Sequence, residues 1–375
     1  MKYIYVILLF GTLLACKEDK PVASVNQEIN SSIRFAKGFD IEIFINLSKI
    51  IIKRPFPNAQ TQEVFYLIPK SVEIPDSLQN KNIIRTPVES IVPTSTTHIP
   101  VIELFDMENK IVGFPQMNYI SSARTTELVN NGKIAELGNI QNLNFEILIS
   151  LNPELVIGFS MGENDASFSR LEQTTIPVLF NGDWLEEDPL GRAEWLKLFG
   201  ALFEKSEKAD SIFNLIEKEY IEAKKIALQS KDRPTVLSGI LFEDKWSLPA
   251  GESFMANLFK DANTNYLWRE TRGTGSLVLS LESVIETGKS AELWIGSGIF
   301  TNYQAMLESN NHYNTFKAFQ EKKIFNFAKR RGEQGGILFF ELAPIQPHIV
   351  LKDLIKASHP DLLPNYIPYF LEPLD

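Results

Sequence analysis

The chain has 375 residues and a formal net charge of −10, with 44% hydrophobic and 22% charged residues. This length is enough for two domains with separate cores, and the composition is that of a globular chain rather than a disordered one. The negative charge, without any long block of Lys or Arg, excludes nucleic acid as the expected partner.

Residues 1–16 have the pattern of a secretion signal that ends in a lipidated cysteine. An apolar run over residues 4–14 follows a positively charged start and is too short to span a bilayer as a stable helix. The run ends in the letters LLAC, which resemble the signal of bacterial lipoproteins, where the cysteine is diacylated and becomes the new N-terminus. Cys16 is the only cysteine of the chain, so it forms no internal disulfide. We therefore expect a signal peptide over 1–15.

The residues after this cysteine are polar, and 16–31 are expected to form a lipidated tether. Two acyl chains on Cys16 would give lasting attachment to a membrane. The charged run KEDK at 17–20 resembles the tag that sends some lipoproteins to the outer face of the outer membrane. The expected location is the cell envelope, on the periplasmic face of a membrane or on the outer surface of the outer membrane.

Residues 32–88 are predicted to form a β-rich extension of the first lobe. Short apolar runs alternate there with prolines, which is typical of hairpins and turns. We interpret this part as an antiparallel β element that precedes or flanks the lobe. Strands are expected at 32–36, 40–47, 50–52, 63–68, 83–85 and 90–92.

From residue 89 onward short strands alternate with helices, which indicates parallel or mixed sheets with helices on their faces. The pattern runs over 89–204, gives way to a long helical segment, and restarts after Pro234. We therefore predict an α/β fold of two Rossmann-like lobes, the N-terminal one over 89–204 and the C-terminal one over 232–375. Strands are expected at 110–114, 154–158, 177–180, 235–241, 291–296 and 324–327, and helices at 144–150, 254–260, 313–319 and 348–358.

Residues 205–231 are predicted to form one long helix between the lobes. Apolar residues such as Phe213, Ile216 and Tyr220 recur at spacings of three and four, which gathers them on one helical face. A helix of about 27 residues spans roughly 40 Å, about the width of a domain, so it can join two lobes stiffly. The alternative is an ordinary surface helix of one large α/β domain.

A short pattern occurs once on each side of this helix. FEILI at 145–149 precedes ELVIG at 154–158, and LESVI at 281–285 precedes ELWIG at 292–296. Each copy consists of a helix that opens with an acid and an apolar strand that ends in Gly. Two matched halves explain the repetition, and chance similarity of two βαβ units is the alternative.

Catalytic motifs are few. The sequence contains no H-E-x-x-H, no P-loop and no C-x-x-C, and the letters GFSMG at 158–162 are a match to the short G-x-S-x-G pattern. The four histidines are scattered and lie in no metal-ligand spacing. Of these only His98, which follows a predicted strand, is expected near a cleft. We therefore expect a binding protein without a resident metal or cofactor rather than an enzyme.

Aromatic residues recur after predicted strands. In open α/β sheets ligands sit beyond the carboxyl ends of the strands, and flat apolar side chains there suit a large, partly apolar ligand. Taken singly, each aromatic residue is equally explained as part of a core. Arg330 and Arg331 offer charge-assisted hydrogen bonds to acidic groups of a ligand. The candidate aromatic contacts are Phe159, Trp184, Phe242 and Trp246.

Several segments match a known family in order. The most specific one runs over 137–157 and contains LG, NFE and LNPELVI. The others are IVPTSTTH at 91–98, KIVGF at 110–114, PAGESF at 249–254, HPDLL at 359–363 and YF at 369–370. These segments resemble the substrate-binding proteins of bacterial ABC importers for cobalamin and iron chelates, in which one long helix joins two lobes. The resemblance covers residues 88–375.

The resemblance implies roles for particular residues. In this family each lobe presents an acid to arginines of the membrane permease, and these acids correspond to Glu146 and Glu282. Acids that simply favour a helix N-terminus are the alternative explanation of both. Ligand-contacting positions of the cleft correspond to Met117, Ile140 and Phe159. Cobalamin binders have aromatic residues at these positions, and here only Phe159 keeps one.

We therefore expect a lipid-anchored, monomeric receptor that captures a metal chelate and delivers it to an ABC permease. The expected ligand is an iron chelate, such as a siderophore or haem, or cobalamin. Two other classes are left open: a metal-binding enzyme with a chelatase-like two-lobed fold, and a surface receptor without a permease partner. The stiff helix predicts that the lobes close little on binding.

Overall fold

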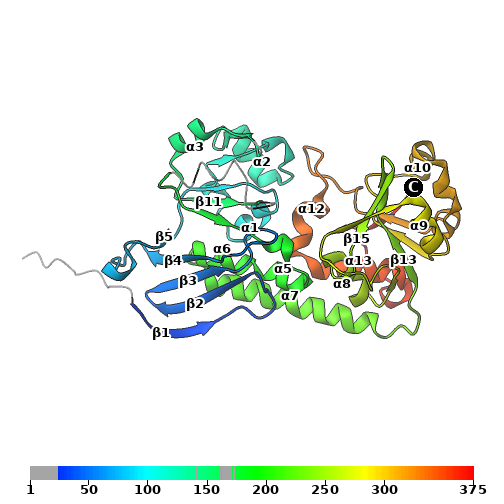
Figure 1. The fold of residues 1–375 in the computed structure, drawn as a ribbon, viewed down its shortest axis with the longest axis horizontal. Helices are drawn as coiled ribbons and strands as arrows, with labels where there is room; N and C mark the ends of the chain where they lie inside the picture. Colours follow the sequence, from blue (N-terminus) through cyan, green and yellow to red (C-terminus); the bar gives the residue numbers. More distant parts are fainter. Residues whose placement is uncertain (1–23, 141, 161, 163–170, 172–173) are drawn as a thin grey trace, which may run out of the picture.

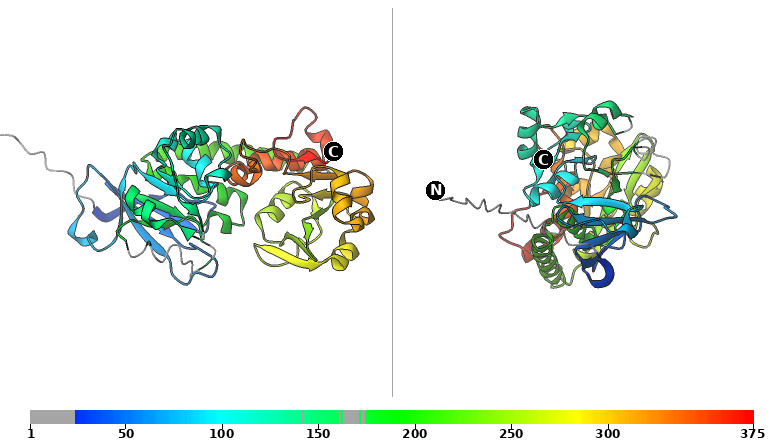
Figure 2. Two further views of the ribbon diagram at one scale, coloured as in Figure 1. Left: turned by 90° about the horizontal axis from the view of Figure 1, so that it is seen from above. Right: turned by 90° about the vertical axis from the view of Figure 1, so that its left-hand side faces the viewer.

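The protein consists of two α/β lobes joined by one long helix that runs along one side of both (Figures 1 and 2). The computed structural model describes residues 24–140, 142–160, 162, 171 and 174–375. A separate β-sheet built from the N-terminal residues packs beneath the N-terminal lobe in the view of Figure 1. The predicted fold class is therefore confirmed.

The N-terminal sheet has the strand order β1-β2-β3-β4-β5, antiparallel from β1 to β4 and parallel between β4 and β5. Three predictions for this part are wrong. Residues 24–31, expected within the tether, form an edge strand, which needs main-chain partners but no apolar pattern. Segment 40–47 is split into two strands by Asn46, whose φ is 62°, and 32–36 is a loop. The strands are β1 (Ser24–Ser31), β2 (Phe39–Ile45), β3 (Leu47–Ile52), β4 (Glu63–Pro69) and β5 (Asn82–Thr86).

One face of this sheet belongs to the core of the N-terminal lobe. Phe39 and Ile41 of β2 and Ile50 of β3 are buried, since alternate residues of a strand point to the same side. The ring of Phe39 lies against Trp195 of the lobe, with 4.4 Å between ring centroids. The extension is thus packed as part of the lobe.

Two buried carboxylates fix the loop between β1 and β2 to the lobe. Glu194 accepts hydrogen bonds from the main-chain N–H groups of 34–36, and Glu186 accepts those of 37–38, at 2.7 to 3.0 Å. A buried carboxylate is costly unless its oxygens have donors. Five consecutive N–H groups supply these donors, so the loop and the two side chains stabilise each other's position.

The N-terminal lobe has a parallel sheet of the order β8-β7-β6-β11-β12, in which an isolated bridge between Ile91 and Ile111 joins β6 to the segment before β7. The residues of β6 and β11 are wholly buried, as expected for strands covered on both faces. The strand predicted at 110–114 is shorter, because a 3-10 turn occupies its start. The strands are β6 (Ile91–Pro93), β7 (Gly113–Phe114), β8 (Ala135–Glu136), β9 (Gly138–Asn139), β10 (Asn142–Leu143), β11 (Leu155–Gly158) and β12 (Val178–Phe180).

Helices of this lobe begin where the sequence offers a capping side chain. The side chain of Ser122 accepts a hydrogen bond from Thr125 N at the start of α2, and that of Asn144 accepts one from Ile147 N at the start of α3. The helices are α1 (His98–Leu104), α2 (Ala123–Asn130), α3 (Phe145–Leu151), α5 (Pro189–Glu194) and α6 (Leu196–Leu202), and the 3-10 turns are η1 (Asp76–Leu78), η2 (Glu108–Lys110), η3 (Met117–Tyr119) and η5 (Asp183–Leu185).

The C-terminal lobe repeats this plan. Its main sheet has the order β16-β13-β18-β19-β20 and is parallel apart from β20. A second, antiparallel sheet of the order β14-β15-β17 follows β13. The strands are β13 (Thr235–Ser238), β14 (Ile240–Phe242), β15 (Lys245–Pro249), β16 (Asn265–Tyr266), β17 (Ser276–Ser280), β18 (Leu293–Ile295), β19 (Ile324–Asn326) and β20 (Glu372–Pro373).

Helices cover the main sheet of this lobe, and one short helix leaves it toward the other lobe. The helix predicted at 313–319 is a 3-10 turn followed by a short α-helix. The helices are α8 (Phe254–Asp261), α9 (Leu281–Gly288), α10 (Tyr303–Ser309), α11 (Lys317–Gln320), α12 (Leu338–Leu342) and α13 (Pro347–Ser358), and the 3-10 turns are η6 (Asn311–Thr315), η7 (Ala343–Ile345) and η8 (Pro360–Leu362).

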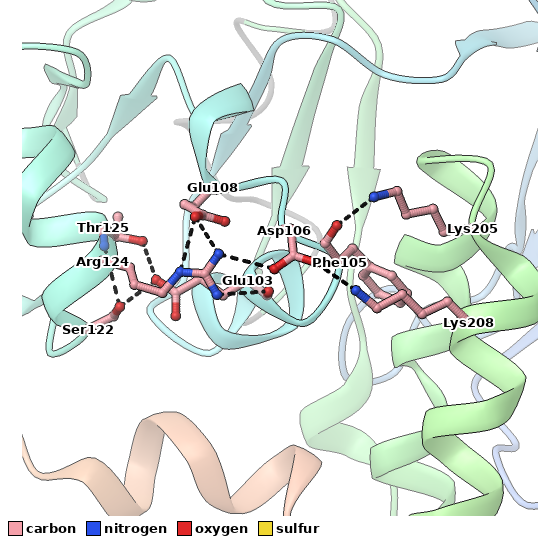
Figure 3. Close-up of polar contacts among 9 residues, drawn as sticks. All are labelled: Glu103, Phe105, Asp106, Glu108, Ser122, Arg124, Thr125, Lys205 and Lys208. Atoms are coloured by element: carbon pink, nitrogen blue, oxygen red, sulfur yellow. Dashed lines mark hydrogen bonds and ion pairs between the residues drawn. The ribbon is translucent and has the colours of Figure 1, made fainter.

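The long helix α7 (Ser206–Ala227) ends four residues before the predicted end at residue 231. Its buried residues are those of the predicted apolar face, and they pack on α5 and α6 of one lobe and on α13 of the other. At its start Lys205 and Lys208 reach the turn after α1, where Lys208 Nζ lies 2.8 Å from Asp106 (Figure 3). Further along, Tyr220 donates to Asp261 of α8 at 2.8 Å. Helix α7 is thus bonded to both lobes.

The repeated sequence pattern corresponds to matched elements. Helix α3 leads into β11, which lies between β12 and β6, and helix α9 leads into β18, which lies between β13 and β19. In both lobes the pattern therefore forms a helix and the inner strand that follows it. The two copies occupy equivalent places in the two halves.

Candidate ligand-binding cleft

The strand order of each lobe reverses at one point. In the N-terminal lobe the chain adds strands first on one side of β6 and then on the other, through β11. In the C-terminal lobe the same happens around β13, with β16 on one side and β18 on the other. Ligands of open α/β sheets bind beyond the carboxyl ends of the strands at such a point.

A hollow of about 350 Å³ lies at this point of the N-terminal lobe. Thr94 and Ser95 follow β6, and Phe159 follows β11, on one side of the hollow. Phe340 and Glu341 of α12 close it from the other lobe. The hollow is therefore part of a cleft between the lobes. Its other lining residues are Thr96, Phe114, Pro115, Gln116, Tyr119, Ser121, Ile140, Gly336 and Ile337.

A second hollow, of about 170 Å³, lies at the matching point of the C-terminal lobe. Ser238 ends β13, Gly296 follows β18 and Phe327 follows β19. Ile337 and Phe340 line this hollow as well as the first one. Figure 1 shows α12 between the two lobes, so the hollows flank it in one interlobe cleft.

Helix α12 is tied to its own lobe by ring stacking and to the other lobe by a close approach of main chain. Phe339 stacks on Phe327 with 3.9 Å between centroids. The loop before α12 comes so near the N-terminal lobe that a Cβ on Gly332 would lie 2.4 Å from Ser121 Cβ. A Cβ on Gly336 would lie 2.6 Å from Ser121 Oγ. A side chain at position 332 would meet the main chain of Ser121, so the loop or the lobe would have to shift, whereas at position 336 the nearest atom is the rotatable Oγ of Ser121.

Glu341 completes this contact between the lobes. It is 3% exposed, and its Oε2 accepts a hydrogen bond from Ser121 N at 3.2 Å. Burial raises the pKa of Glu341 to about 7, and although the bonds from Ser121 lower the pKa, the charge of Glu103 raises it. The carboxyl group therefore changes its charge near neutral pH.

Four predicted ligand contacts lie at or beside the cleft. Ile140 and Phe159 line the larger hollow. Trp184 lies behind Phe159, with 5.4 Å between ring centroids. Met117 begins η3 directly after the lining residue Gln116 and is half-buried against the core. These positions came from the family resemblance and from aromatic residues at strand ends.

Two predicted contacts, His98 and Trp246, are core residues instead. His98 is 1% exposed and packs on Phe199, and burial lowers its pKa to about 3. Trp246 is fully buried beside Trp294 and donates from Nε1 to Ser238 O at 3.0 Å. The alternation of polar and apolar residues along β15 turns Trp246 inward, and α1 turns His98 into the lobe.

Three further predicted contacts lie outside both hollows. Phe242 ends β14 and is 73% exposed. Arg330 is engaged within its own lobe, with its guanidinium 4.5 Å from the ring of Tyr369 and 3.7 Å from Glu372. Arg331 is exposed and donates from Nη1 to a main-chain oxygen of its loop at 2.8 Å. The structure therefore does not bring the two arginines into the lining of the cleft.

Of the residues that line the larger hollow, sequence reasoning predicted only Ile140 and Phe159 as ligand contacts; those that it missed include Tyr119, Ser121, Phe340 and Glu341. Ser121 and Glu341 are 220 residues apart in the chain, so no local pattern connects them. One signal was present: Glu341 is an acid within the apolar run ILFFELAPI. Acidic side chains are almost never fully buried unless they have a partner, so an acid in an apolar run indicates such a contact.

The two predicted docking acids have matching environments. Glu146 and Glu282 are exposed and lie in the first turns of α3 and α9. The main-chain N–H of Glu282 and the hydroxyl of Ser280 hold the pKa of Glu282 below its ordinary value. Both acids are thus charged groups on the surface at equivalent positions of the two halves.

A third depression lies elsewhere on the molecule, and its position argues against it as the ligand site. It has a volume of about 720 Å³ and is lined by Pro234, Glu292 and Lys323, which precede β13, β18 and β19. It lies at the amino ends of the strands, where open α/β sheets do not bind their ligands. Among the described residues no cluster of His, Cys, Asp and Glu is placed to hold a metal ion.

The predicted signal peptide and Cys16 lie outside the described residues. In the part of the chain that the structure describes, no helix has both the length and the apolar character needed to cross a bilayer.

Comparisons with known proteins agree with this geometry. A family model described as "Periplasmic binding protein" matches residues 91–330. An uncharacterized lipoprotein of Methanocaldococcus jannaschii is 24% identical over 293 residues, which cover 75% of this chain and 68% of that protein. A periplasmic haem binding protein of Pseudomonas aeruginosa is similar in structure, with a TM-score of 0.57 and 15% identity over 77% of this chain and 98% of the other. A periplasmic vitamin B12 binding protein of Vibrio cholerae has a TM-score of 0.52 and 13% identity over 72% and 97%.

Proposed function

Since the chain belongs to the periplasmic binding protein family, we propose that it captures a metal chelate or a corrinoid between its lobes and delivers it to the permease of an ABC importer. The observation that carries this proposal is the cleft around α12, because its walls are the strand ends at the reversal points of both sheets. Solved structures of similar fold include proteins that bind haem and vitamin B12.

The chemistry of the cleft suits a ligand with a broad apolar surface. Phe159, Phe340 and Ile337 offer apolar faces, and the side chains of Gln116 and Tyr119 offer polar groups. Each 100 Å² of apolar ligand surface that is buried contributes about 2.5 kcal/mol. A few polar groups then fix the orientation of the ligand.

Contacts within the chain hold the two lobes together. Helix α7 is bonded to both of them, and the loop before α12 already touches Ser121 of the other lobe. We therefore propose that the cleft is largely preformed. Small-angle scattering of the free and the loaded protein checks this, and a decrease in radius typical of hinge closure would contradict it.

Ligand binding is tested directly with purified protein. A corrinoid, an iron porphyrin and ferric siderophores are added in turn, and both the visible absorption of the ligand and the tryptophan fluorescence are followed. Phe159→Ala should weaken binding by about tenfold through lost apolar contact. The matched control is Phe242→Ala, an exposed aromatic outside both hollows. If Phe242→Ala weakens binding and Phe159→Ala does not, the cleft is not the site.

Delivery is proposed to use Glu146 and Glu282 as contacts for the permease. Replacing both by Ala should abolish uptake of the ligand in intact cells and leave its dissociation constant unchanged, because both acids are exposed and lie outside the hollows. Glu207→Ala is the control, because Glu207 is also an exposed acid in the first turn of a helix. Unchanged uptake in the double variant would remove the docking role and favour a receptor without a permease.

We also propose that diacylated Cys16 anchors the protein in the cell envelope. Cys16→Ser should release the protein from membrane fractions while the purified protein still binds its ligand. Retention of the variant in the membrane would contradict the anchor.

A further inference from the structure

We infer that the cleft selects ligands that present hydrogen-bond donors rather than carboxylates to α12, and that Glu341 is the residue that sets this preference. The inference rests on the proposed function and narrows its ligand class. It follows from the charges that line the cleft, from the side chains behind Glu341, and from the places where the nearby arginines are bound.

Among the described residues, the lining of the cleft carries one acid and no base. Of the residues that line the two hollows, Glu341 alone has a carboxyl group, and none is a Lys, Arg or His. The rest are hydroxyl, amide, aromatic, aliphatic and glycine residues. A buried ligand carboxylate would therefore find no cationic partner in the described part of the cleft.

Arg330 and Arg331, which precede α12 in the chain, contact other groups instead of Glu341. Arg330 contacts Tyr369 and Glu372 of its own lobe, at 4.5 Å and 3.7 Å. Arg331 is exposed and is bonded to the main chain of its own loop. Neither guanidinium lines the hollows, so neither of these two arginines compensates the charge of Glu341 on the side that faces the ligand.

The side chains behind Glu341 add negative charge rather than positive charge. Glu103 of α1 is held by the hydroxyl groups of Ser122 and Thr125, the latter at 2.6 Å (Figure 3). Arg124, the cation on α2, forms ion pairs with Asp106 and Glu108 after α1 and also interacts electrostatically with Glu103 (Figure 3). The seam between α12 and the N-terminal lobe is thus acidic.

A carboxylate in this setting favours particular ligand chemistry. Ser121 alone supplies the hydrogen bonds to Glu341 among the described residues, through its main-chain N–H and its side chain. A ligand amide, hydroxyl or ammonium group at this place would add a donor and stabilise the ionised carboxylate. A ligand carboxylate would meet a like charge in a site of low dielectric constant. The favoured ligand is therefore a chelate or corrinoid whose side chains are amides, alcohols or amines.

The preference should depend on pH. The pKa of Glu341 is about 7, so Glu341 is increasingly ionised above neutral pH and increasingly protonated below it. Rejection of a ligand carboxylate should therefore be strong at about pH 8 and weak at about pH 6. Among the described residues, the groups that act on Glu341 are the main chain and side chain of Ser121 and the carboxylate of Glu103, of which only Glu103 is titratable.

Two matched pairs of probes test the inference. Each pair is one macrocycle, an iron porphyrin or a corrinoid, with its side chains either as free carboxylates or as the corresponding amides. In the wild-type protein the amide form should bind at least about tenfold more tightly than the carboxylate form at about pH 8. Glu341→Gln should reduce this ratio to about one and remove its pH dependence, since the amide that replaces the carboxyl keeps its shape but not its charge. Circular dichroism establishes that the variant is folded.

Glu333→Gln is the matched control, because Glu333 is an exposed acid on the same loop and lines neither hollow. It should keep the wild-type ratio. If the wild-type protein binds the carboxylate form as tightly as the amide form, or more tightly, the inference is wrong and the proposed function stands. If it binds no member of either pair and no ferric siderophore, the proposed function fails and the inference fails with it. The comparison of the two ligands in the wild-type protein needs no variant to fold.

Discussion

At two interfaces within this molecule, which we call seams, buried carboxylates accept hydrogen bonds from main-chain N–H groups of another segment. The two seams differ in the number of donors that each carboxylate has. Between the N-terminal sheet and α5, Glu186 and Glu194 receive the N–H groups of 34–38. Between the lobes, Glu341 receives the N–H of Ser121. The first seam is a structural contact, because main-chain N–H groups satisfy the hydrogen-bonding capacity of both of its carboxylates.

The second seam has room for another molecule to supply donors. Its carboxyl group lines a hollow, and its pKa is raised to about 7 chiefly by burial. Perturbed groups of this kind in a cleft are candidates for function rather than for stability alone. The difference teaches that the number of donors around a buried carboxylate, more than its burial, separates a structural contact from a binding contact.

The largest effect is expected at the first seam. Glu194→Ala leaves the partly buried N–H groups of 34–36 without their acceptor and the buried Lys197 without one of its carboxylates, so the free energy of unfolding should fall by about 3–5 kcal/mol. Denaturant unfolding followed by circular dichroism measures this change. The exposed acid Glu207 gives the control, since Glu207→Ala should change the free energy by less than about 0.5 kcal/mol. A loss at Glu194 as small as that of the control would show that the first seam contributes no stability.

A smaller, pH-dependent effect is expected at the seam between the lobes. The pKa of Glu341 is about 7 when folded and 4.5 as its ordinary value. Between these values the folded state binds more protons than the unfolded state, so wild-type stability falls as the pH rises through this window. Glu341→Gln lacks this loss and should exceed the wild type by about 1–3 kcal/mol above the window and by little below it. Thermal unfolding at several pH values measures the difference, and a constant difference would contradict the raised pKa.

The smallest effect is expected at the loop that brings α12 to the other lobe. Gly332→Ala places a Cβ 2.4 Å from Ser121 Cβ, and the exposed loop can yield, so the loss of stability should be about 1 kcal/mol. The radius of gyration should increase slightly in small-angle scattering. Gly275→Ala is the control, because a Cβ there meets nothing within 4 Å. Equal scattering profiles of the two variants would show that the loop does not set the distance between the lobes.

The sequence predicted the parts of the fold that depend on local periodicity. The apolar face of α7 follows from spacings of three and four. The second α/β lobe, which starts after Pro234, follows from the alternation of strands and helices. Strand β1 escaped prediction because an edge strand is held by main-chain bonds to β2, which leave no pattern in its side chains. Trp246 was assigned to the cleft because strand ends were located but the inward face of β15 was not considered.

The cleft could be predicted only in part. Ile140 and Phe159 were found because the resemblance carries positions along one lobe. The contact of Ser121 with Glu341 depends on how the two lobes meet, and it joins residues 220 positions apart. Such a pairing is decided by tertiary packing, so propensity and periodicity carry no information on it.

The loop of residues 34–38 also determines how the molecule responds to a pull on its N-terminus. The chain enters the fold at β1, and this loop directly follows β1. Its five N–H groups are clamped by Glu186 and Glu194, which lie beside and within α5. Tension on the chain is therefore transmitted to the body of the N-terminal lobe before it can reach α12. The contacts of this loop therefore separate the cleft from tension that is applied to the chain ahead of β1.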